Sequence, residues 1–277
     1  MAEITAAQVK KFRDRTGLPM MECKKALQEA NGDEEAAIEL LRKAGKKTME
    51  KRSDRETGAG RIAIYTDPAT GTTAMVELLC ESAPVTQNEE FIALVNNMAK
   101  QLATGSGAAD GDALMKQNTP GKSTPLQQDF DDLMNKIREV FKVGRIKRIA
   151  GDCASYLHHN AAVGVLLKIV GKDLALARDI CMHVASMKPK ALKQSDLPAD
   201  VVEKERQMIA EEVKENNVGK PDNIIEKIAD GKLKAFLAEC CLLDQPFVKD
   251  PSRTVAQVCK DGNIEVVEMV HWVLGTP

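Results

Sequence analysis

The residue types that most often do chemistry, histidine and cysteine, are scattered along this chain. The four histidines stand at positions 158, 159, 183 and 271. The seven cysteines, among which no C-x-x-C pair occurs, stand at positions 23, 80, 153, 181, 240, 241 and 259. Catalysis or zinc binding would require a nucleophile beside a base, or several ligands at short spacing. The sequence therefore predicts no catalytic residue, no metal site and no cofactor, and the cysteines fit a reducing compartment.

The adjacent histidines are better explained as contact residues than as ligands. His158, His159 and Asn160 occupy a turn before Val163–Val170, an apolar segment with the composition of a strand. A metal ion held by this turn would still need a carboxylate or a thiol, and the neighbouring residues offer neither. We therefore interpret this turn as a contact loop.

A second contact loop is indicated between a strand and a helix. Met75–Leu79 is an apolar run of strand formers, and Glu89–Met98 carries apolar residues at helical spacing, so Cys80–Gln87 should connect them on the surface. The small or apolar residues of this loop are Ser82, Ala83, Pro84 and Val85. We interpret them as residues that touch a partner, and the alternative is an ordinary connection.

Residues 1–45 predict a bundle of three short helices. Thr16-Gly17 ends the first, Pro19 begins the second, Asn31-Gly32 closes it, and Asp33 caps the third. This pattern is typical of a ubiquitin-associated-like (UBA-like) domain, whose usual work is binding. Met20-Met21 is a candidate contact pair, although such a pair can equally form the seam between helices.

The body that follows contains an internal repeat. Gly60–Tyr65 recurs as Gly151–Tyr156, and each copy is followed by a turn, an apolar strand and a helix. We therefore predict an α+β protein with two related subdomains, each a small antiparallel sheet with covering helices. Subdomain N spans 60–141, and subdomain C spans 142–197 and 238–277, ending in a helix and a final strand.

The segments between these parts have distinct compositions. Segment 46–59 is highly charged and should be a linker that lets the bundle sit away from the body. Gly105–Pro125 is rich in Gly, Ser, Ala and Asp and should be a flexible surface excursion, whereas Leu126–Phe141 should be helical.

Residues 198–237 predict an antiparallel helical hairpin inserted in subdomain C. The first arm is charged with a narrow apolar stripe, in which Val201 and Met208 are spaced by seven as in a coiled coil, and 218–221 should form the turn. We expect an arm for a partner or for self-association, so the sequence leaves a homodimer open.

Composition limits the kinds of partner. The net charge is -2 with 29% charged residues, so no electrostatic attraction to nucleic acid is implied. No apolar run is long enough to cross a bilayer, and the N-terminal residues lack a signal core. We expect a soluble, cytoplasmic protein that contacts neither nucleic acid nor membrane and recognises partners by shape.

Seven stretches, in this order, resemble the elongation factor Ts family, the exchange factors for the GTPase elongation factor Tu. They are VKKFRDRTGLPMMECKKALQEANGDEEAAIELLRKAG from Val9, the strand and loop at Met75–Phe91, SYLHHNAAVGVLLKIVG from Ser155, MHVASMKP from Met182, VVEKERQ from Val201, GKPDNIIEKIADGKLKAF from Gly219, and QPFVKDPSRTV from Gln245. The resemblance implies a UBA-like domain, two related core subdomains, and a coiled-coil hairpin in the second.

The resemblance also implies a function. The chain would bind elongation factor Tu, both GDP-bound and nucleotide-free, and promote GDP release without any covalent step, so it would not be an enzyme in the chemical sense. Arg13, Met20 and Met21 would dock the bundle on the GTPase domain. The loop Ser82–Val85 would press near the magnesium site, and the turn His158–Asn160 would contact another domain of the same partner.

The sequence departs from the family at the central loop. The family pattern Thr-Asp-Phe-Val is replaced here by Ser82, Ala83, Pro84 and Val85, so the acid and the aromatic wedge are missing. Ala161-Ala162 stands where Gly-Arg often follows the Asn, and Leu18-Pro19 replaces Ala-Gly. We therefore expect this loop to act less strongly than in other members.

Two other classes stay open at this point. A non-catalytic adapter that binds a helical or ubiquitin-like partner through residues 1–45 would explain the bundle but not the repeated body. A metabolic enzyme would explain the subdomains but leaves no catalytic residues. Association with elongation factor Tu that excess GDP reverses separates an exchange factor from an adapter, and turnover of a small molecule would indicate an enzyme.

Overall fold

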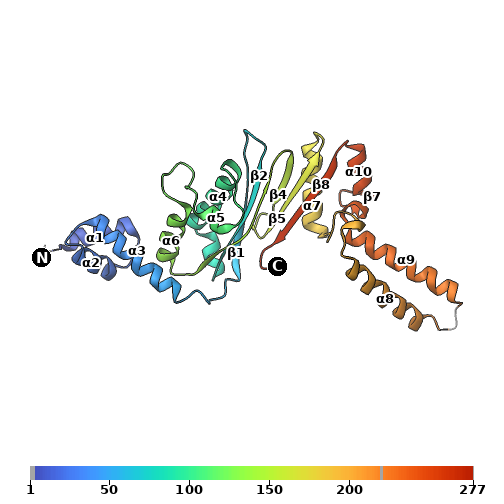
Figure 1. Cartoon of the computed structure of the whole chain (residues 1–277), viewed down its shortest axis with the longest axis horizontal. Helices are drawn as coiled ribbons and strands as arrows, with labels where there is room; N and C mark the ends of the chain where they lie inside the picture. Colours follow the sequence, from blue (N-terminus) through green and yellow to red (C-terminus); the bar gives the residue numbers. More distant parts are fainter. Residues whose placement is uncertain (1–3, 219–220, 277) are drawn as a thin grey trace. The chain divides into compact units, whose positions relative to one another are not determined.

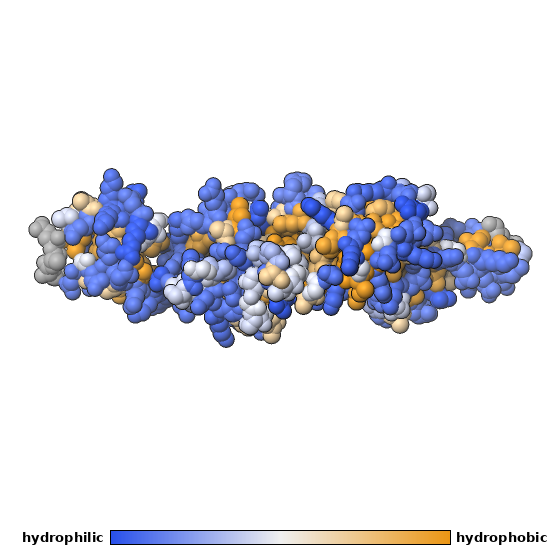
Figure 2. Space-filling view, turned by 90° about the horizontal axis from the view of Figure 1, so that it is seen from above, coloured by the Kyte–Doolittle hydropathy of each residue, from blue (hydrophilic) through white to orange (hydrophobic). Residues whose placement is uncertain are grey.

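The computed structural model describes residues 4–218 and 221–276, and it shows a mixed α+β protein (Figure 1). The chain forms two compact units. Unit 1 consists of the residues up to Pro68, Ala74–Arg148 and the last residues from Leu274, whereas unit 2 consists of Ala69–Thr73 and Ile149–Val273. Within the described ranges, no helix is both long and apolar enough to cross a membrane. The face seen in Figure 2 is mainly hydrophilic.

Unit 1 begins with three helices, which we call the N-terminal bundle: α1 (Ala6–Thr16), α2 (Met20–Glu29) and α3 (Glu34–Glu50). Thr5 and Gln8 cap α1 reciprocally, Gly17 ends it with a φ of 69°, and the Asp33 carboxylate accepts two backbone N–H groups of α3. The apolar faces of these helices enclose a core of Val9, Phe12, Leu18, Cys23, Ala26, Leu27, Ala37 and Leu41.

The third helix is longer than the sequence indicates, and it holds the bundle in place. It ends at Glu50, inside the segment 46–59 that is expected as a linker, because Met49 on the extension is buried. It packs against α6 (Leu126–Ile137), and Gly45 comes so close that an added Cβ would lie 2.3 Å from the Asn135 Cγ. The expectation that the bundle sits away from the body is therefore corrected.

The body of unit 1 is a three-stranded sheet covered by helices. The strands are β1 (Ala59–Thr66), β2 (Thr73–Cys80) and β3 (Phe141–Ile149), in the order β1-β2-β3. The helices after β2 are α4 (Glu89–Thr104), α5 (Gly111–Met115) and α6. Phe91 and Phe130 both meet Phe141 edge-on, at ring-centroid distances of 5.1 and 5.8 Å. These rings join α4, α6 and β3 in one core.

The segment Gly105–Pro125 is not the surface excursion that its composition suggests. It contains α5, on which Leu114 and Met115 are buried in the core of unit 1. The Gln117 side chain donates a hydrogen bond to the Gly107 carbonyl oxygen at 2.6 Å. Buried apolar residues and several hydrogen bonds, among them the Asp110 cap of α5 and the bond from Thr119 to Asp129, therefore fold this Gly-rich segment against the core.

The helix expected over Leu126–Phe141 ends earlier than predicted. α6 stops at Ile137 because Arg138 adopts a φ of 70°, which a helix cannot continue. Phe141 then begins β3, a strand that the sequence analysis missed. This strand completes the sheet of unit 1 beside β2.

Unit 2 repeats this order of elements. Two strands, β4 (Cys153–Leu157) and β5 (Val163–Val170), precede the helix α7 (Leu174–Met187), and the last strand, β8 (Glu265–Val273), pairs with β5. Both pairings are antiparallel. A short hairpin of β6 (Pro246–Phe247) and β7 (Asp250–Thr254) and the helix α10 (Val255–Asp261) lie before β8. The final helix and strand that the sequence predicts are thus present.

Two long helices complete unit 2, α8 (Ala199–Asn216) and α9 (Asp222–Cys240), which lie side by side (Figure 1). Ile209, Val213 and Leu233 are their buried contacts with each other. The predicted turn at 218–221 includes Gly219 and Lys220, which lie outside the described residues. We call α8 and α9 the helical hairpin.

Candidate partner-contact surfaces

The loop between β2 and α4 is a short, well-anchored turn. Ala83–Gln87 forms the 3₁₀ helix η1, and Pro84 sits in its first turn, where its fixed φ and missing N–H are tolerated. Val85 points inward and is buried, whereas Ala83 and Pro84 are exposed. The predicted contact residues therefore divide into an inner anchor and an exposed apex.

One acidic residue holds the start of this turn. The Glu139 carboxylate accepts the backbone N–H of Ser82 at 3.0 Å and its hydroxyl at 2.5 Å. Burial, aided by the nearby Glu139 charge, raises the pKa of the Cys80 thiol to about 11. Ser82 is therefore a supporting residue for Ala83 and Pro84, and Cys80 remains a neutral thiol.

The neighbouring Glu81 carboxylate is held as an anion. Burial alone would raise its pKa, but the Val140 N–H at 2.8 Å and the Arg55 guanidinium at 2.9 Å together lower the pKa below its ordinary value. These contacts join the end of β2 to the chain that leaves α6. The start of the loop is thus fixed at both Glu81 and Ser82.

The methionine pair of the bundle is on the surface. Met20 and Met21 begin α2 and expose 40% and 72% of their surface. Their exposure places them outside the helix seam, and their role as contact residues stays a prediction. Arg13 on α1 is also exposed, and its guanidinium forms an ion pair with Asp14 at 3.1 Å.

The turn between β4 and β5 carries the third set of predicted contact residues. The Tyr156 hydroxyl lies 2.9 Å from the His158 Nδ1, and the rings of His158 and His159 are 4.3 Å apart. The Asn160 side chain accepts the Ala162 N–H at 3.0 Å, and Ala161 is buried with a φ of 54°. His159 and Asn160 are exposed, so the turn presents them on an ordered backbone.

A set of charged residues that the sequence analysis missed lies between the bundle and the loop. Arg138 pairs with Glu22 of α2 at 2.5 Å, and Lys136 pairs with Glu90 of α4. Glu139 accepts a hydrogen bond from Ser82. Arg138 and Glu139, which are neighbours in the chain, therefore reach the bundle and the loop, the two predicted contact surfaces of unit 1. No sequence signal could have found them, because each partner is far away in the chain.

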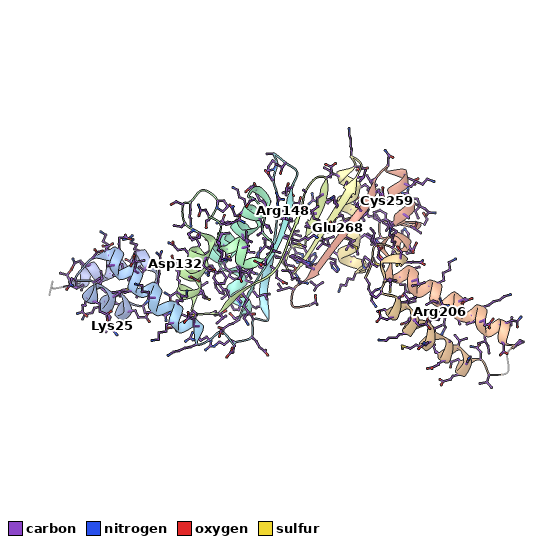
Figure 3. The ribbon with its side chains drawn as sticks, viewed as in Figure 1. Lys25, Asp132, Arg148, Arg206, Cys259 and Glu268 are labelled. Carbon is purple, nitrogen blue, oxygen red and sulfur yellow. The ribbon has the colours of Figure 1, made fainter. Side chains whose placement is uncertain are left out.

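Six of the seven cysteines have environments that suppress thiolate chemistry. All seven are free and buried. Burial raises the pKa of Cys153, Cys241 and Cys259 to about 11, and it also raises the pKa values of Cys181 and Cys240. Cys259, labelled in Figure 3, lies on α10. In the part of the chain that the structure describes, no group of three His, Cys, Asp or Glu side chains could hold a metal ion.

Comparison with known proteins identifies the family. The family model described as "Elongation factor TS" matches residues 84–276, more than half of the chain. An Elongation factor Ts from Azoarcus sp. (strain BH72) is 42% identical over 278 residues, covering 99% of this chain and 92% of the relative. That of Thioalkalivibrio sulfidiphilus (strain HL-EbGR7) is 39% identical over 275 residues, covering 98% and 92%. The chain therefore belongs to the elongation factor Ts family, the guanine nucleotide exchange factors of translation elongation.

Proposed function

We propose that this protein binds elongation factor Tu in its GDP-bound form and releases the GDP by gripping the GTPase at three surfaces. The observation that carries the proposal is similarity to Elongation factor Ts proteins over 98–99% of the chain. The proposed architecture is a UBA-like domain at 1–45, subdomains N and C, and a coiled-coil hairpin inserted in subdomain C. The protein would act in the cytoplasm without direct contact with nucleic acid.

Exchange of this kind is a problem of coupled binding. A nanomolar nucleotide complex is worth about 12 kcal/mol, so GDP leaves slowly on its own. A protein speeds its release only by favouring a partner conformation in which the phosphate and magnesium contacts are broken. It must then bind the nucleotide-free partner more tightly than the GDP-bound one, by the factor by which it weakens GDP. Several separated contacts on one partner suit this requirement.

The three surfaces have different properties, which suggests different roles. Met20 and Met21 are flexible, exposed side chains and suit docking on an apolar patch. Ala83 and Pro84 form a blunt apex on an anchored turn, so they suit pressure on the partner rather than hydrogen bonding. The turn at His158–Asn160 offers polar groups on an ordered backbone.

The proposal is tested by release of a fluorescent GDP analogue from the cognate elongation factor Tu. Adding this protein should accelerate release, and excess GDP should dissociate the complex. The matched variants are Met20→Ser with Met21→Ser in the bundle, and Met208→Ser, an exposed methionine of the hairpin, as the control. An unchanged release rate with the unaltered protein would reject the exchange function.

The altered loop offers a second measurement in the same assay. Restoring the family pattern with Ala83→Asp and Pro84→Phe should speed GDP release from a partner of ordinary sequence, because an acid and an aromatic reach further toward the magnesium site. On the cognate partner the same change should slow GDP release if the partner's surface that faces this loop has changed to match Ala83 and Pro84. If the double substitution leaves the GDP release rate unchanged on both partners, the loop makes no energetically important contact.

A further inference from the structure

We propose that residues 136–139, which we call the α6 exit, set the spacing between the Met20-Met21 surface and the Ser82–Val85 turn. These residues would act as positioning residues for the exchange function proposed above, on which this inference rests. They need not touch the partner themselves. Successive side chains at the end of α6 reach in different directions, Arg138 to the bundle and Glu139 to the turn.

On one side, the α6 exit holds the bundle at the start of α2. The Arg138 guanidinium pairs with Glu22, which directly follows the methionine pair, at 2.5 Å. The Arg138 carbonyl oxygen accepts a hydrogen bond from Arg52, just beyond α3, at 3.1 Å. The Lys136 side chain lies against Gly17, where an added Cβ would be 2.6 Å from the Lys136 Cε. The α6 exit thus contacts the chain on both sides of Met20 and Met21.

On the other side, the same residues hold the turn. Glu139 accepts both the backbone N–H and the hydroxyl of Ser82, and Lys136 pairs with Glu90 in the first turn of α4. The next residue, Val140, donates its N–H to Glu81 at 2.8 Å. The turn is therefore fixed at its start by Glu139 and behind its end by Lys136.

The backbone of the α6 exit explains how neighbouring side chains reach opposite directions. Arg138 has a φ of 70°, a left-handed conformation that is costly for a residue with a side chain. Its N–H still bonds to the Met134 carbonyl oxygen at 2.9 Å, so the change of direction occurs within one turn. The result is a short, ordered connection between a docking surface and a surface that presses on the partner.

This arrangement predicts that the two halves of the α6 exit affect different kinetic constants. Loosening the bundle should weaken docking and raise the KM for the GDP-bound partner. Loosening the turn should leave docking intact and lower the kcat of release, because pressure on the partner is applied less firmly. A merely structural role would change both constants together or neither.

The experiment measures exchange kinetics of Arg138→Ala and Glu139→Gln in the full chain. Arg138→Ala should raise KM about twofold to fivefold with kcat unchanged, since the lost contact is a partly exposed ion pair. Glu139→Gln, with only one acceptor oxygen, should lower kcat about threefold to tenfold with KM unchanged. The charge-swapped pair Glu22→Arg with Arg138→Glu should restore KM. Lys122→Ala, which removes the Lys122–Asp129 ion pair in the same unit, is the control and should change neither constant.

A second readout needs no partner. Spin labels at Lys25→Cys on α2 and Gln87→Cys at the end of η1 report the distance between bundle and turn, and labelling is selective because the native cysteines are buried. Arg138→Ala and Glu139→Gln should each broaden the distance distribution, and Lys122→Ala should not. Unchanged distributions, or both variants altering the same constant, would overturn the inference. If the unaltered chain does not accelerate GDP release from the partner, the proposed function is rejected. The spin-label distances would then decide the inference on their own.

Discussion

The N-terminal bundle and the helical hairpin are both helical additions to a sheet, yet they are attached in different ways. The bundle encloses its own core and is also fixed along α6. The hairpin has buried contacts mainly between its own two arms, at Ile209, Val213 and Leu233, and joins unit 2 at its base. Both regions consist of helices with one apolar face. They differ in the contacts that they make with the rest of their unit.

The junction between the bundle and α6 depends on small size and charge. Gly45 allows α3 to approach Asn135, whose side chain donates to the Leu41 carbonyl oxygen at 3.4 Å. Arg42 forms a bidentate pair with Asp132, the residue labelled on α6 in Figure 3, at 2.8 and 2.7 Å. These contacts hold α3 against α6, so the bundle belongs to the same compact unit as the sheet.

The base of the hairpin depends on a buried hydrogen-bond chain. The His183 Nδ1 accepts the Val248 N–H at 3.2 Å, so its Nε2 carries the proton that is donated to the Gln245 Oε1 at 2.8 Å. Gln245 donates in turn to the Glu239 carbonyl oxygen, in α9, at 2.6 Å. The last turn of the hairpin is thus tied to α7 through neutral groups.

The largest effect is expected from emptying the two small cores. Phe12→Ala should cost about 3–5 kcal/mol, and because the bundle is fixed to α6 the loss should lower the unfolding free energy of all of unit 1. Leu233→Ala should lower the free energy of local unfolding of the hairpin by about 2–5 kcal/mol. This loss should appear as faster amide exchange in α8 and α9. Urea unfolding and hydrogen exchange measure the two effects. If Phe12→Ala accelerates amide hydrogen exchange in the bundle alone, the bundle is as independent of its unit as the hairpin is.

A pair of glycine substitutions tests the junction directly. Gly45→Ala places a Cβ 2.3 Å from Asn135 and should destabilise unit 1 by about 1–3 kcal/mol through overpacking. Gly231→Ala, in the middle of α9 with nothing within 4 Å of the added Cβ, should instead stabilise the hairpin by about 0.5–1 kcal/mol. The measurement is the urea midpoint of each variant, with hydrogen exchange for α9. Stabilisation by Gly45→Ala would show that α3 and α6 are not in close contact.

The parts of this fold that depend on local pattern could be predicted from the sequence. Gly17 and Asp33 mark helix ends through their own backbone chemistry, and the apolar run from Met75 identifies the central strand. The parts in which the deciding contact is distant in the chain could not. Nothing near Gly45 indicates that Asn135 will lie against it, and β3 was missed because Phe141 is assigned to a sheet only by its pairing with β2.

The contact surfaces divide in the same way. The exposure of Met20-Met21 and of Ala83 and Pro84 could be predicted from their residue types and positions, while their contact with a partner stays a prediction. The charged residues that support them could not, since Arg138 and Glu139 look like ordinary surface residues after a helix. Only the folded chain brings them to Glu22 and Ser82.

A smaller effect is expected from one ion pair at the junction between the bundle and α6 and from one in the helical hairpin. Arg42 and Asp132 are each about 40% exposed and bonded through two N–H groups, so a double-mutant cycle to Ala should give about 0.5–1 kcal/mol of coupling. Lys232 and Glu212 of the hairpin share one contact at 2.7 Å and should give about 0–0.5 kcal/mol. Both couplings should shrink in 1 M salt. Equal couplings would remove the distinction between the bidentate junction and the single hairpin pair.

The smallest expected effect is a pH dependence that belongs to the hairpin base alone. Burial lowers the pKa of His183, although its hydrogen bond to Gln245 opposes the shift. As pH falls below about 6.5, the unfolded chain therefore takes up this proton before the folded chain does, and stability that is fully present above this pH is lost as pH falls toward the folded pKa. No histidine occurs in the first 150 residues, so the bundle junction has no side chain whose ordinary pKa lies in that range. The protection factor of the Val248 amide, which donates to His183, should fall between pH 7 and 5.5 in the unaltered protein once the intrinsic pH dependence of amide exchange is divided out. The difference from His183→Gln isolates this group from the other histidines of unit 2, and an identical pH profile in that variant would show that the buried hydrogen-bond chain does not control how firmly the hairpin is held.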